Sequence, residues 1–265
     1  MIGASFKATI LAIVSQLGLH ILATCATFKR FLTRYARIRL AKKLWSLVPM
    51  RSVRIEIVIV TIILLSFAIA GYFYPQISER MASHWNARAE VDGYMSKFWG
   101  LFLMPFISLG LSALLLVIPK IDPLKANIEK FKRYYYGFVI LLLIFLFYLY
   151  LLTILWNLGL RFNFIQLLVP AFGVLFYFCG VLIGKAKRNW FIGIRTPWTL
   201  SNEKVWDKTH FIGGRLFKAA GLVALLGVFF QNHAILFVIV PVILVSLFTI
   251  VYSYFEYQKE KATQQ

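Results

Sequence analysis

The chain has 265 residues, of which 60% are hydrophobic and only 15% are charged. A soluble protein of this length needs charged residues on the outer face of every helix, whereas here the charges collect between apolar runs. The composition therefore excludes a soluble globular fold. Apolar runs of about 20 residues recur, the length of helix that crosses a hydrocarbon layer of ~30 Å. Residues 141–147 are continuously apolar rather than alternating, which argues against a β-barrel.

The N-terminal residues 1–54 form a basic leader with one weak apolar run at 8–27. That run is either a seventh helix or a signal peptide, although no Ala-x-Ala-like cleavage site precedes a polar mature sequence. Residues 28–38 alternate apolar and basic positions at helical spacing, which favours either a cationic helix on the inner leaflet or a simple orientation signal. A third hypothesis is that translation starts at Met50, so that residues 1–49 are not part of the native chain.

Six stronger apolar runs follow, and we predict spans at about 55–74, 98–118, 134–156, 165–184, 216–231 and 234–255. The expected fold is therefore an all-α, polytopic transmembrane helical bundle with six main spans. We divide it into the first three spans, at 55–156, and a second domain of three spans, at 157–265. Cys25 and Cys179 both fall in apolar runs and predict neither a disulfide nor a metal ligand.

The basic residues follow an alternating pattern. From residues 1–54 onward, successive connections hold ten, three, five, one, seven and no Lys or Arg. Cells retain Lys and Arg on the cytoplasmic side of the membrane, so the pattern predicts a multi-pass protein of the cell membrane with both ends of the six-span core in the cytoplasm. This topology also accounts for the net charge of +19 without direct binding of nucleic acid.

The spans carry no Asp, Glu, Lys, Arg or His in their central portions. Coupled transport needs a partner charge inside the bilayer, so the sequence disfavours it, while a passive or lipid-handling path stays open. No motif for catalysis, a phosphate loop or a cofactor is found, and we predict neither a cofactor nor an enzyme. Asp207 and His210 are spaced for an acid and base pair on a helix, or for an ordinary surface hydrogen bond. The predicted topology separates His210 from His84 by a membrane thickness, so the two cannot share a metal.

The outer connection between the first two spans carries His84, Trp85 and Asn86, followed by Asp92 and Gly93. Asp-Gly predicts a turn, because glycine accepts a positive φ and aspartate bonds the backbone beyond it. The three residues before the turn are either a polar recognition patch above the bilayer or an interfacial anchor that touches no ligand.

The inner connection carries Asn-Trp-Phe-Ile-Gly-Ile-Arg-Thr-Pro-Trp-Thr-Leu-Ser-Asn at 189–202, where amphipathic indole rings suit a membrane surface. Ser201 is the predicted N-cap of a short helix that lies along the membrane until Gly213 and Gly214 let the chain turn into the fifth span. Arg195 is predicted to bind lipid phosphate, to stack on an indole, or to bind a cytoplasmic protein. The candidate binding residues are Asn189, Trp190, Gly193, Arg195, Thr196, Pro197, Trp198, Ser201, Asn202, Trp206 and His210.

The segment 189–202, with Trp206, Thr209-His210 and Gly213-Gly214, resembles the signature of the SdpI family of bacterial and archaeal membrane proteins. The outer residues 84–86, 92–93 and 96–97 resemble a domain of unknown function that commonly precedes this signature. The resemblance covers roughly residues 55–255. Two positions depart from it: Ala89 stands where a glycine is frequent before the outer acidic residue, and Phe211-Ile212 stands where an arginine and an aromatic residue are common.

This resemblance implies six spans with both ends inside. For the best-known member it implies resistance to a secreted peptide toxin and capture of a DNA-binding repressor at the membrane. We therefore expect a non-enzymatic immunity or signal-receiving protein whose partners are membrane lipids, a secreted peptide toxin and a cytoplasmic repressor. The alternatives are a permease or lipid-handling protein, and an accessory subunit of another membrane protein.

Overall fold

A computed structural model describes residues 52–230 and 233–263, so that the predictions for the leader and for Cys25 lie outside the described residues. Within these ranges, six helices are long and apolar enough to cross a membrane. They are α3 (Ser52–Phe73), α4 (Lys97–Ile121), α6 (Lys132–Asn157), α7 (Phe164–Ile183), α9 (Glu203–Leu226) and α10 (Leu236–Thr263). The predicted all-α polytopic bundle is confirmed, and the chain is a multi-pass membrane protein.

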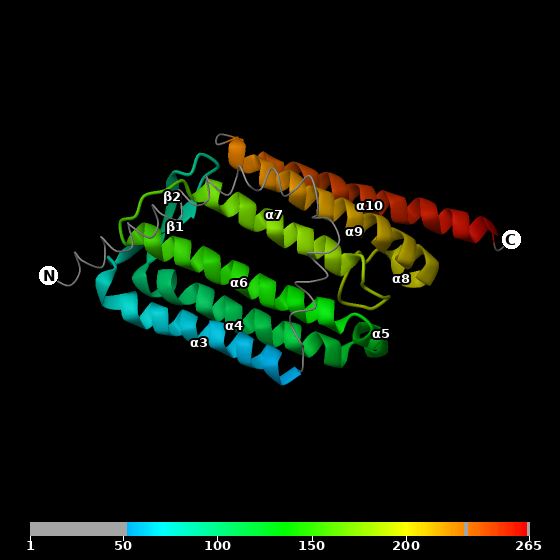
Figure 1. Cartoon of the computed structure of the whole chain (residues 1–265), viewed down its shortest axis with the longest axis horizontal. Coiled ribbons are helices and arrows are strands. Elements are labelled where there is room, and N and C mark those ends of the chain that lie inside the picture. The colour runs from blue at the N-terminus through cyan, green and yellow to red at the C-terminus, as the bar shows by residue number, and fades with distance from the viewer. Residues whose placement is uncertain (1–51, 231–232, 264–265) are drawn as a thin grey trace, which may run out of the picture. The chain divides into compact units, whose positions relative to one another are not determined.

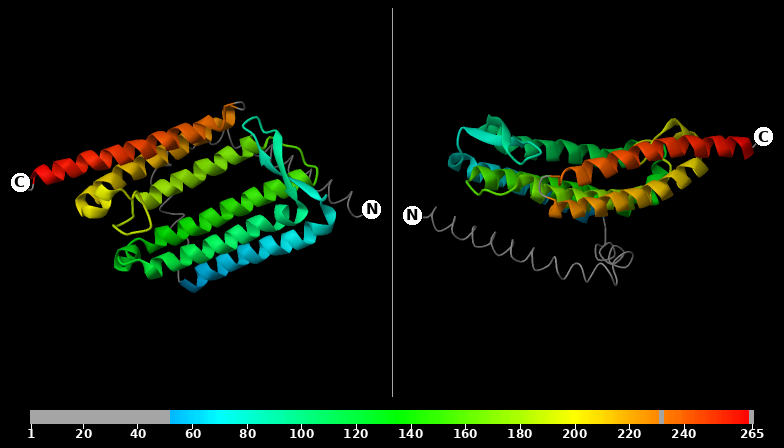
Figure 2. Two further views of the ribbon diagram at one scale, coloured as in Figure 1. Left: turned by 180° about the vertical axis from the view of Figure 1, so that it is seen from behind. Right: turned by 90° about the horizontal axis from the view of Figure 1, so that it is seen from above.

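The six helices run side by side and alternate in direction, so that their connections gather at two opposite ends (Figures 1 and 2). One end carries the strands β1 (Arg80–Trp85) and β2 (Val91–Ser96), with the short helices η1 (Tyr74–Gln76) and η2 (Gly227–Phe229). The other end carries α5 (Lys125–Glu129), α8 (Pro197–Ser201) and residues 185–202. We call the first the hairpin end and the second the signature end.

Two groups of three helices make up the bundle. α3, α4 and α6 pack on one another, while α7 packs along α9 and α9 along α10; α6 and α7 join the groups. The α7–α9 contact is close because glycines face it from both helices. A Cβ added to Gly180 would lie 2.6 Å from Lys218 N and 2.7 Å from Gly214 O, so only glycine allows this approach of the two backbones.

The fifth span differs from the prediction at its start. The helix α9 begins at Glu203 and runs without a break to Leu226, so the separate surface helix and the turn at Gly213 and Gly214 are wrong. The two glycines continue the helix because their missing side chains make room for neighbours. A Cβ added to Gly213 would collide with Ile194, and one on Gly214 would lie 2.7 Å from Gly184 N. Helix packing therefore outweighs the weak helix propensity of glycine.

The outer connection folds into an antiparallel hairpin of β1 and β2. The predicted turn at Asp92 and Gly93 is wrong, because both residues lie in β2, where Gly93 pairs with His84 at an irregularity of the register. The chain turns earlier, where Asn86 N–H donates to Glu90 O at 2.9 Å and Ala89 takes a φ of 62°.

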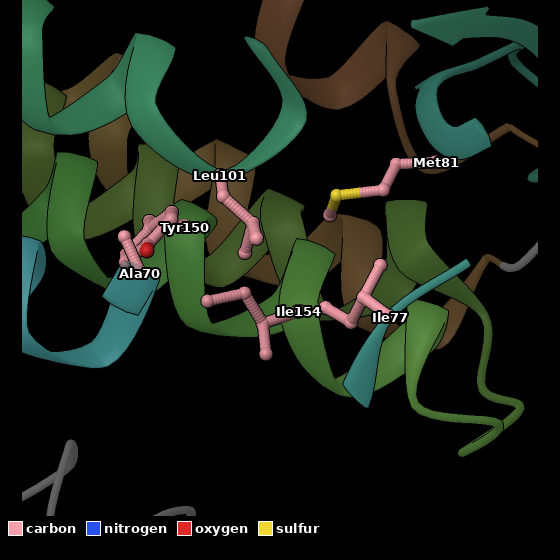
Figure 3. Packing of buried hydrophobic residues seen from close by; sticks show 6 residues of the cluster. All are labelled: Ala70, Ile77, Met81, Leu101, Tyr150 and Ile154. Carbon is pink, nitrogen blue, oxygen red and sulfur yellow. The ribbon is translucent and has the colours of Figure 1, made fainter. Parts of the chain in front are cut away.

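The hairpin rests on a buried apolar cluster built from α3, β1, α4 and α6 (Figure 3). Its members are Ala70, Ile77, Met81, Leu101, Tyr150 and Ile154. Polar bonds complete the docking, since the Asn157 side chain accepts from Ala82 N–H at 2.8 Å and donates to Ala82 O at 3.0 Å. The amide thus pairs with β1 as a neighbouring strand would and fixes the hairpin to the end of α6.

Candidate functional site

The signature end is organised around buried polar side chains. Asn189 is fully buried, and its amide makes four hydrogen bonds to the backbone around it. The side-chain nitrogen donates to the carbonyls of Lys187 and Ile192, and the side-chain oxygen accepts from the N–H groups of Phe191 and Ile192. One side chain therefore satisfies a loop that has no ladder or helix to pair its backbone.

His210 holds the next part of the segment. Its Nε2 accepts from Ile194 N–H at 3.0 Å, and this leaves Nδ1 to donate to Trp206 O at 2.8 Å, so the ring is neutral with its proton on Nδ1. The imidazole stacks on the Trp206 indole at 3.9 Å, and that indole donates to Ala186 O. Gly193, with a φ of 116°, lies against the ring, because a Cβ there would collide with His210 Nε2.

Asp207 and His210 form neither of the two pairs considered for them, an acid and base pair or a surface hydrogen bond. The Asp207 carboxylate instead accepts from Lys187 Nζ at 3.0 Å on the surface. With both imidazole nitrogens bonded and the ring buried, His210 acts as a structural side chain rather than as a proton carrier.

The helix α8 begins with a reciprocal cap. Thr196 is its N-cap and exchanges hydrogen bonds with Thr199, while Pro197 stands in the first turn. The Thr196 hydroxyl also lies 2.9 Å from Ser253 Oγ of α10. The N-cap of α9 is Asn202, which accepts from Lys204 and Val205 N–H, so the prediction of Ser201 for this role is wrong. Ser201 ends α8 instead because the asparagine that follows it has the better-placed side chain.

The remaining candidates keep an accessible surface. Trp190 is 50% exposed, and Arg195, Pro197 and Ser201 are exposed as well. Trp198 is partly exposed, with its edge against Tyr254 at 5.2 Å between ring centroids. The Arg195 guanidinium donates to Trp190 O rather than stacking on an indole. The motif thus has a buried part, formed by Asn189, Thr196, Trp206 and His210, and a part that is exposed or partly exposed.

Two residues that the sequence reasoning missed hold this segment from the other helix group. Asp122, which is 1% exposed, accepts from Trp190 N–H at 2.9 Å and from Leu124 N–H at 2.6 Å. Asn127 donates to Arg188 O at 2.9 Å. An acidic residue before Pro123 in a mainly basic connection was the available signal. These bonds tie the two halves of the bundle together at the signature end.

At the hairpin end, the residues of the outer motif differ in burial and in the contacts that they make. His84 Nδ1 lies 2.5 Å from Asp92 Oδ1, and these side chains are 71% and 46% exposed. Trp85 is buried and stacks on Phe164 of α7 at 4.0 Å, which makes it an anchor. Asn86 accepts from Arg88 N–H and Glu90 N–H and so shapes the turn. Of the outer motif, the His84–Asp92 pair is the part whose side chains stay open to solvent.

Both the hairpin end and the signature end match sequence models of known protein families. The sequence model of the SdpI/YfhL protein family matches residues 185–253, and that of the domain of unknown function DUF1648 matches residues 61–109. The resemblance to the SdpI family is confirmed. The family region covers residues 185–202 of the signature end together with α9 and most of α10, and the preceding domain covers α3 from residue 61 onward, the hairpin and the first half of α4.

A curated relative extends the match over most of the bundle. The immunity protein SdpI of Bacillus subtilis is 28% identical over 207 residues, which cover 77% of this chain and 96% of that protein. No solved structure matches the chain. The chain is thus similar to a membrane immunity protein over most of its length.

Proposed function

We propose that the chain is a non-enzymatic immunity and signal-receiving protein that binds a secreted peptide toxin at its hairpin end. The likeness to the Bacillus subtilis immunity protein supports this class of function. The observation that carries it is the hairpin itself, which is firmly docked on α6 and α7 yet leaves the His84–Asp92 pair exposed. A rigid platform with exposed polar groups is suited to binding.

The proposed orientation puts the hairpin end outside the cell and the signature end in the cytoplasm, with both ends of the six-span core inside. The alternation of basic residues supports it, since the connections between the spans at the signature end are the rich ones. Reporter fusions after Asn86 and after Trp198 test this topology. A cytoplasmic reporter signal after Asn86 would overturn the proposal as a whole.

The backbone of the hairpin favours a peptide as the ligand. Lys97 N–H donates to Glu79 O, and the alternation of an antiparallel ladder then turns the N–H and C=O of Tyr94 away from β1. Asn157 already occupies the outer edge of β1 at Ala82, the residue opposite Tyr94. The outer edge of β2 has no such cover among the described residues. An extended peptide segment therefore fits there as a third strand.

The proposed output is a change in affinity for a cytoplasmic repressor at the exposed signature residues Trp190, Arg195, Pro197 and Trp198. A continuous path of contacts links the two ends: Trp85 stacks on Phe164 at the start of α7, and α7 runs along α9 to the signature. Such coupling requires two states that the two ligands bind differently.

The strand pairing is tested with a proline. Tyr94→Pro removes an N–H that points away from β1 and leaves the hairpin ladder intact, so folding is expected to persist while protection of toxin-challenged cells is lost. Tyr94→Ala is the matched control for the lost ring and is expected to keep most protection. Equal protection by wild type and Tyr94→Pro at equal expression would exclude strand pairing.

Flux through proteoliposomes separates a receptor, which gives none, from a permease.

The cytoplasmic output is tested separately. Arg195→Ala with Trp198→Ala removes two accessible groups of the signature and is expected to abolish repressor capture, measured by fluorescence of a tagged repressor at the membrane. Lys125→Ala, at an exposed position of α5 at the same end, is the control. Capture that persists in the double variant would remove the signature from the proposed partner surface.

A further inference from the structure

A cluster of three cations lies where α9 passes the end of α7. Phe211, Arg215 and Lys218 follow one another at helical spacing on one face of α9. Lys218 is level with Gly180, because a Cβ on that glycine would lie 2.9 Å from Lys218 Cγ. Since α7 ends at Ile183, Lys218 stands about one turn inside the end of the span, and Arg215 stands at its edge.

The third cation approaches from the chain beyond α7. Lys185 lies close enough to Lys218 for the two charges to repel each other, as does Arg215. The Lys185 ammonium lies 5.8 Å from the Tyr134 ring centroid, and the Arg215 guanidinium lies 4.0 Å from that of Phe211. Aromatic rings thus hold two of the positive groups on the surface of the bundle.

Several other basic residues at the signature end have carboxylate partners. Lys187 pairs with Asp207, Lys132 with Glu129, and Lys208 with Glu256 and Glu260. Across the described residues, no ion pair joins Lys185, Arg215 or Lys218 to a carboxylate. Positive groups at the hydrocarbon boundary without a counter-charge within the protein attract the anionic headgroups of the membrane.

The surroundings suit one source of that anion. Toward the membrane interior the same face of α9 continues with Leu222 and Leu226, which are 37% and 51% exposed and offer an apolar surface. Toward the cytoplasm lies an opening of about 250 Å³, lined in part by Lys185, Asp207 and Phe211. A phosphate with an acyl chain on one side and a polar headgroup on the other matches this order of apolar surface, cations and polar opening.

We propose that Lys185, Arg215 and Lys218 bind the phosphate of an anionic phospholipid, with its acyl chain along Leu222 and Leu226. The site is independent of the toxin and repressor proposals, since it lies on the lipid-facing side of α9 and uses none of their residues. Because α9 also carries Trp206 and His210, a lipid bound here supports the helix on which the signature segment is built.

The test compares lipid retention in variants of the full chain. Purified protein is delipidated in detergent, and bound phosphatidylglycerol and phosphatidylcholine are counted by native mass spectrometry. We expect wild type to retain phosphatidylglycerol in about tenfold preference, and Arg215→Gln with Lys218→Gln to lose that preference. The matched control is Lys125→Gln with Lys130→Gln, which removes the same charge at the same end from exposed residues and is expected to retain it.

Three results would overturn the site. These are equal retention by the double variant and wild type, equal retention of the two lipids by wild type, and the same loss in the control, which would indicate a diffuse basic surface. If the double variant does not fold, Lys185→Gln and Arg215→Gln separately give the same test on exposed side chains, each with a loss of about threefold. A thermal-shift series with inorganic phosphate in detergent separates a free anion from a lipid, and stabilisation by phosphate alone would contradict the lipid assignment.

Discussion

The two ends of the bundle use their polar residues in opposite ways. At the signature end, Asn189, Thr196 and His210 are buried and bond to the backbone around them. At the hairpin end, the side chains of the His84–Asp92 pair are mostly exposed and, among the described residues, bond only to each other. The family signature therefore consists in large part of residues that build a loop, while the less distinctive outer motif keeps two polar side chains open to solvent.

This difference shows that a distinctive sequence motif need not be the part of the protein that binds a ligand. An irregular segment at a membrane interface has no ladder to satisfy its backbone, so particular side chains must do so. Such a requirement restricts the residue types strongly, whether or not a ligand binds. Substitutions at the signature end should accordingly reduce folding, and substitutions in the exposed pair should reduce binding alone.

The largest expected effect is at the glycine contact beneath the signature. Gly214→Ala would place a Cβ 2.7 Å from Gly184 N and 2.8 Å from Gly180 O, both backbone atoms that cannot rotate away. We expect the free energy of unfolding to fall by about 3 kcal/mol or more, measured by unfolding in mixed micelles. Gly110→Ala is the control, since nothing lies within 4 Å of a Cβ there; it should change stability by less than about 1 kcal/mol. Similar stability of the two variants would disprove the close approach of α7 and α9.

The next effect concerns the buried amide. Asn189→Ala leaves two carbonyls and two N–H groups of the loop without their partner, and we expect the free energy of unfolding to fall by about 2 to 3 kcal/mol and the buried Trp206 to become exposed to quenching. Tryptophan fluorescence during unfolding measures both the stability and the exposure to quenching. Ser201→Ala, in an exposed position, should stay within about 0.5 kcal/mol of wild type. An Asn189→Ala protein as stable as Ser201→Ala would show that the loop does not depend on this side chain.

The sequence was sufficient to predict the six spans, because hydropathy and length alone decide whether a helix can cross the hydrocarbon layer. It also identified most residues of the signature end. Their roles were not predictable, since an asparagine or histidine next to tryptophans has the same appearance whether it bonds a loop or a ligand. Only the fold shows that His210 bonds Ile194, sixteen residues away.

Two errors share one physical cause. Gly213-Gly214 and Asp92-Gly93 were both interpreted from local conformational preference, which favours turns. In each place, tertiary contact decided the outcome: Gly214 lies against α7, and Gly93 pairs with His84, whose Cβ would be 2.8 Å from an added Cβ. Asp122 was overlooked for the related reason that its partner, Trp190 N–H, lies 68 residues away along the chain.

A smaller effect, of the opposite sign, is expected in the hairpin turn. Ala89 takes a φ of 62°, a left-handed conformation that a Cβ disfavours. Ala89→Gly should therefore raise the free energy of unfolding of the protein by about 0.5 to 1 kcal/mol. The comparison variant is Ala126→Gly in α5, which should be destabilising because the same change in a helix loses propensity. A loss of stability in Ala89→Gly would show that the turn does not have this conformation.

The smallest effect on stability belongs to the exposed pair, where the comparison of the two ends is sharpest. A polar side-chain pair open to water contributes about 0.5 kcal/mol or less, because solvent screens it and both side chains lose freedom in forming it. His84→Ala with Asp92→Ala should thus unfold like wild type. If the hairpin is the toxin surface, the same protein should protect cells poorly, whereas Arg88→Ala, which breaks the neighbouring exposed pair with Glu90, should protect fully. Stability without protection is a combination that no substitution of a buried signature residue can produce. A double variant that is both stable and fully protective would place toxin binding elsewhere on the protein, and one that is unstable would make the outer motif structural, like the inner one.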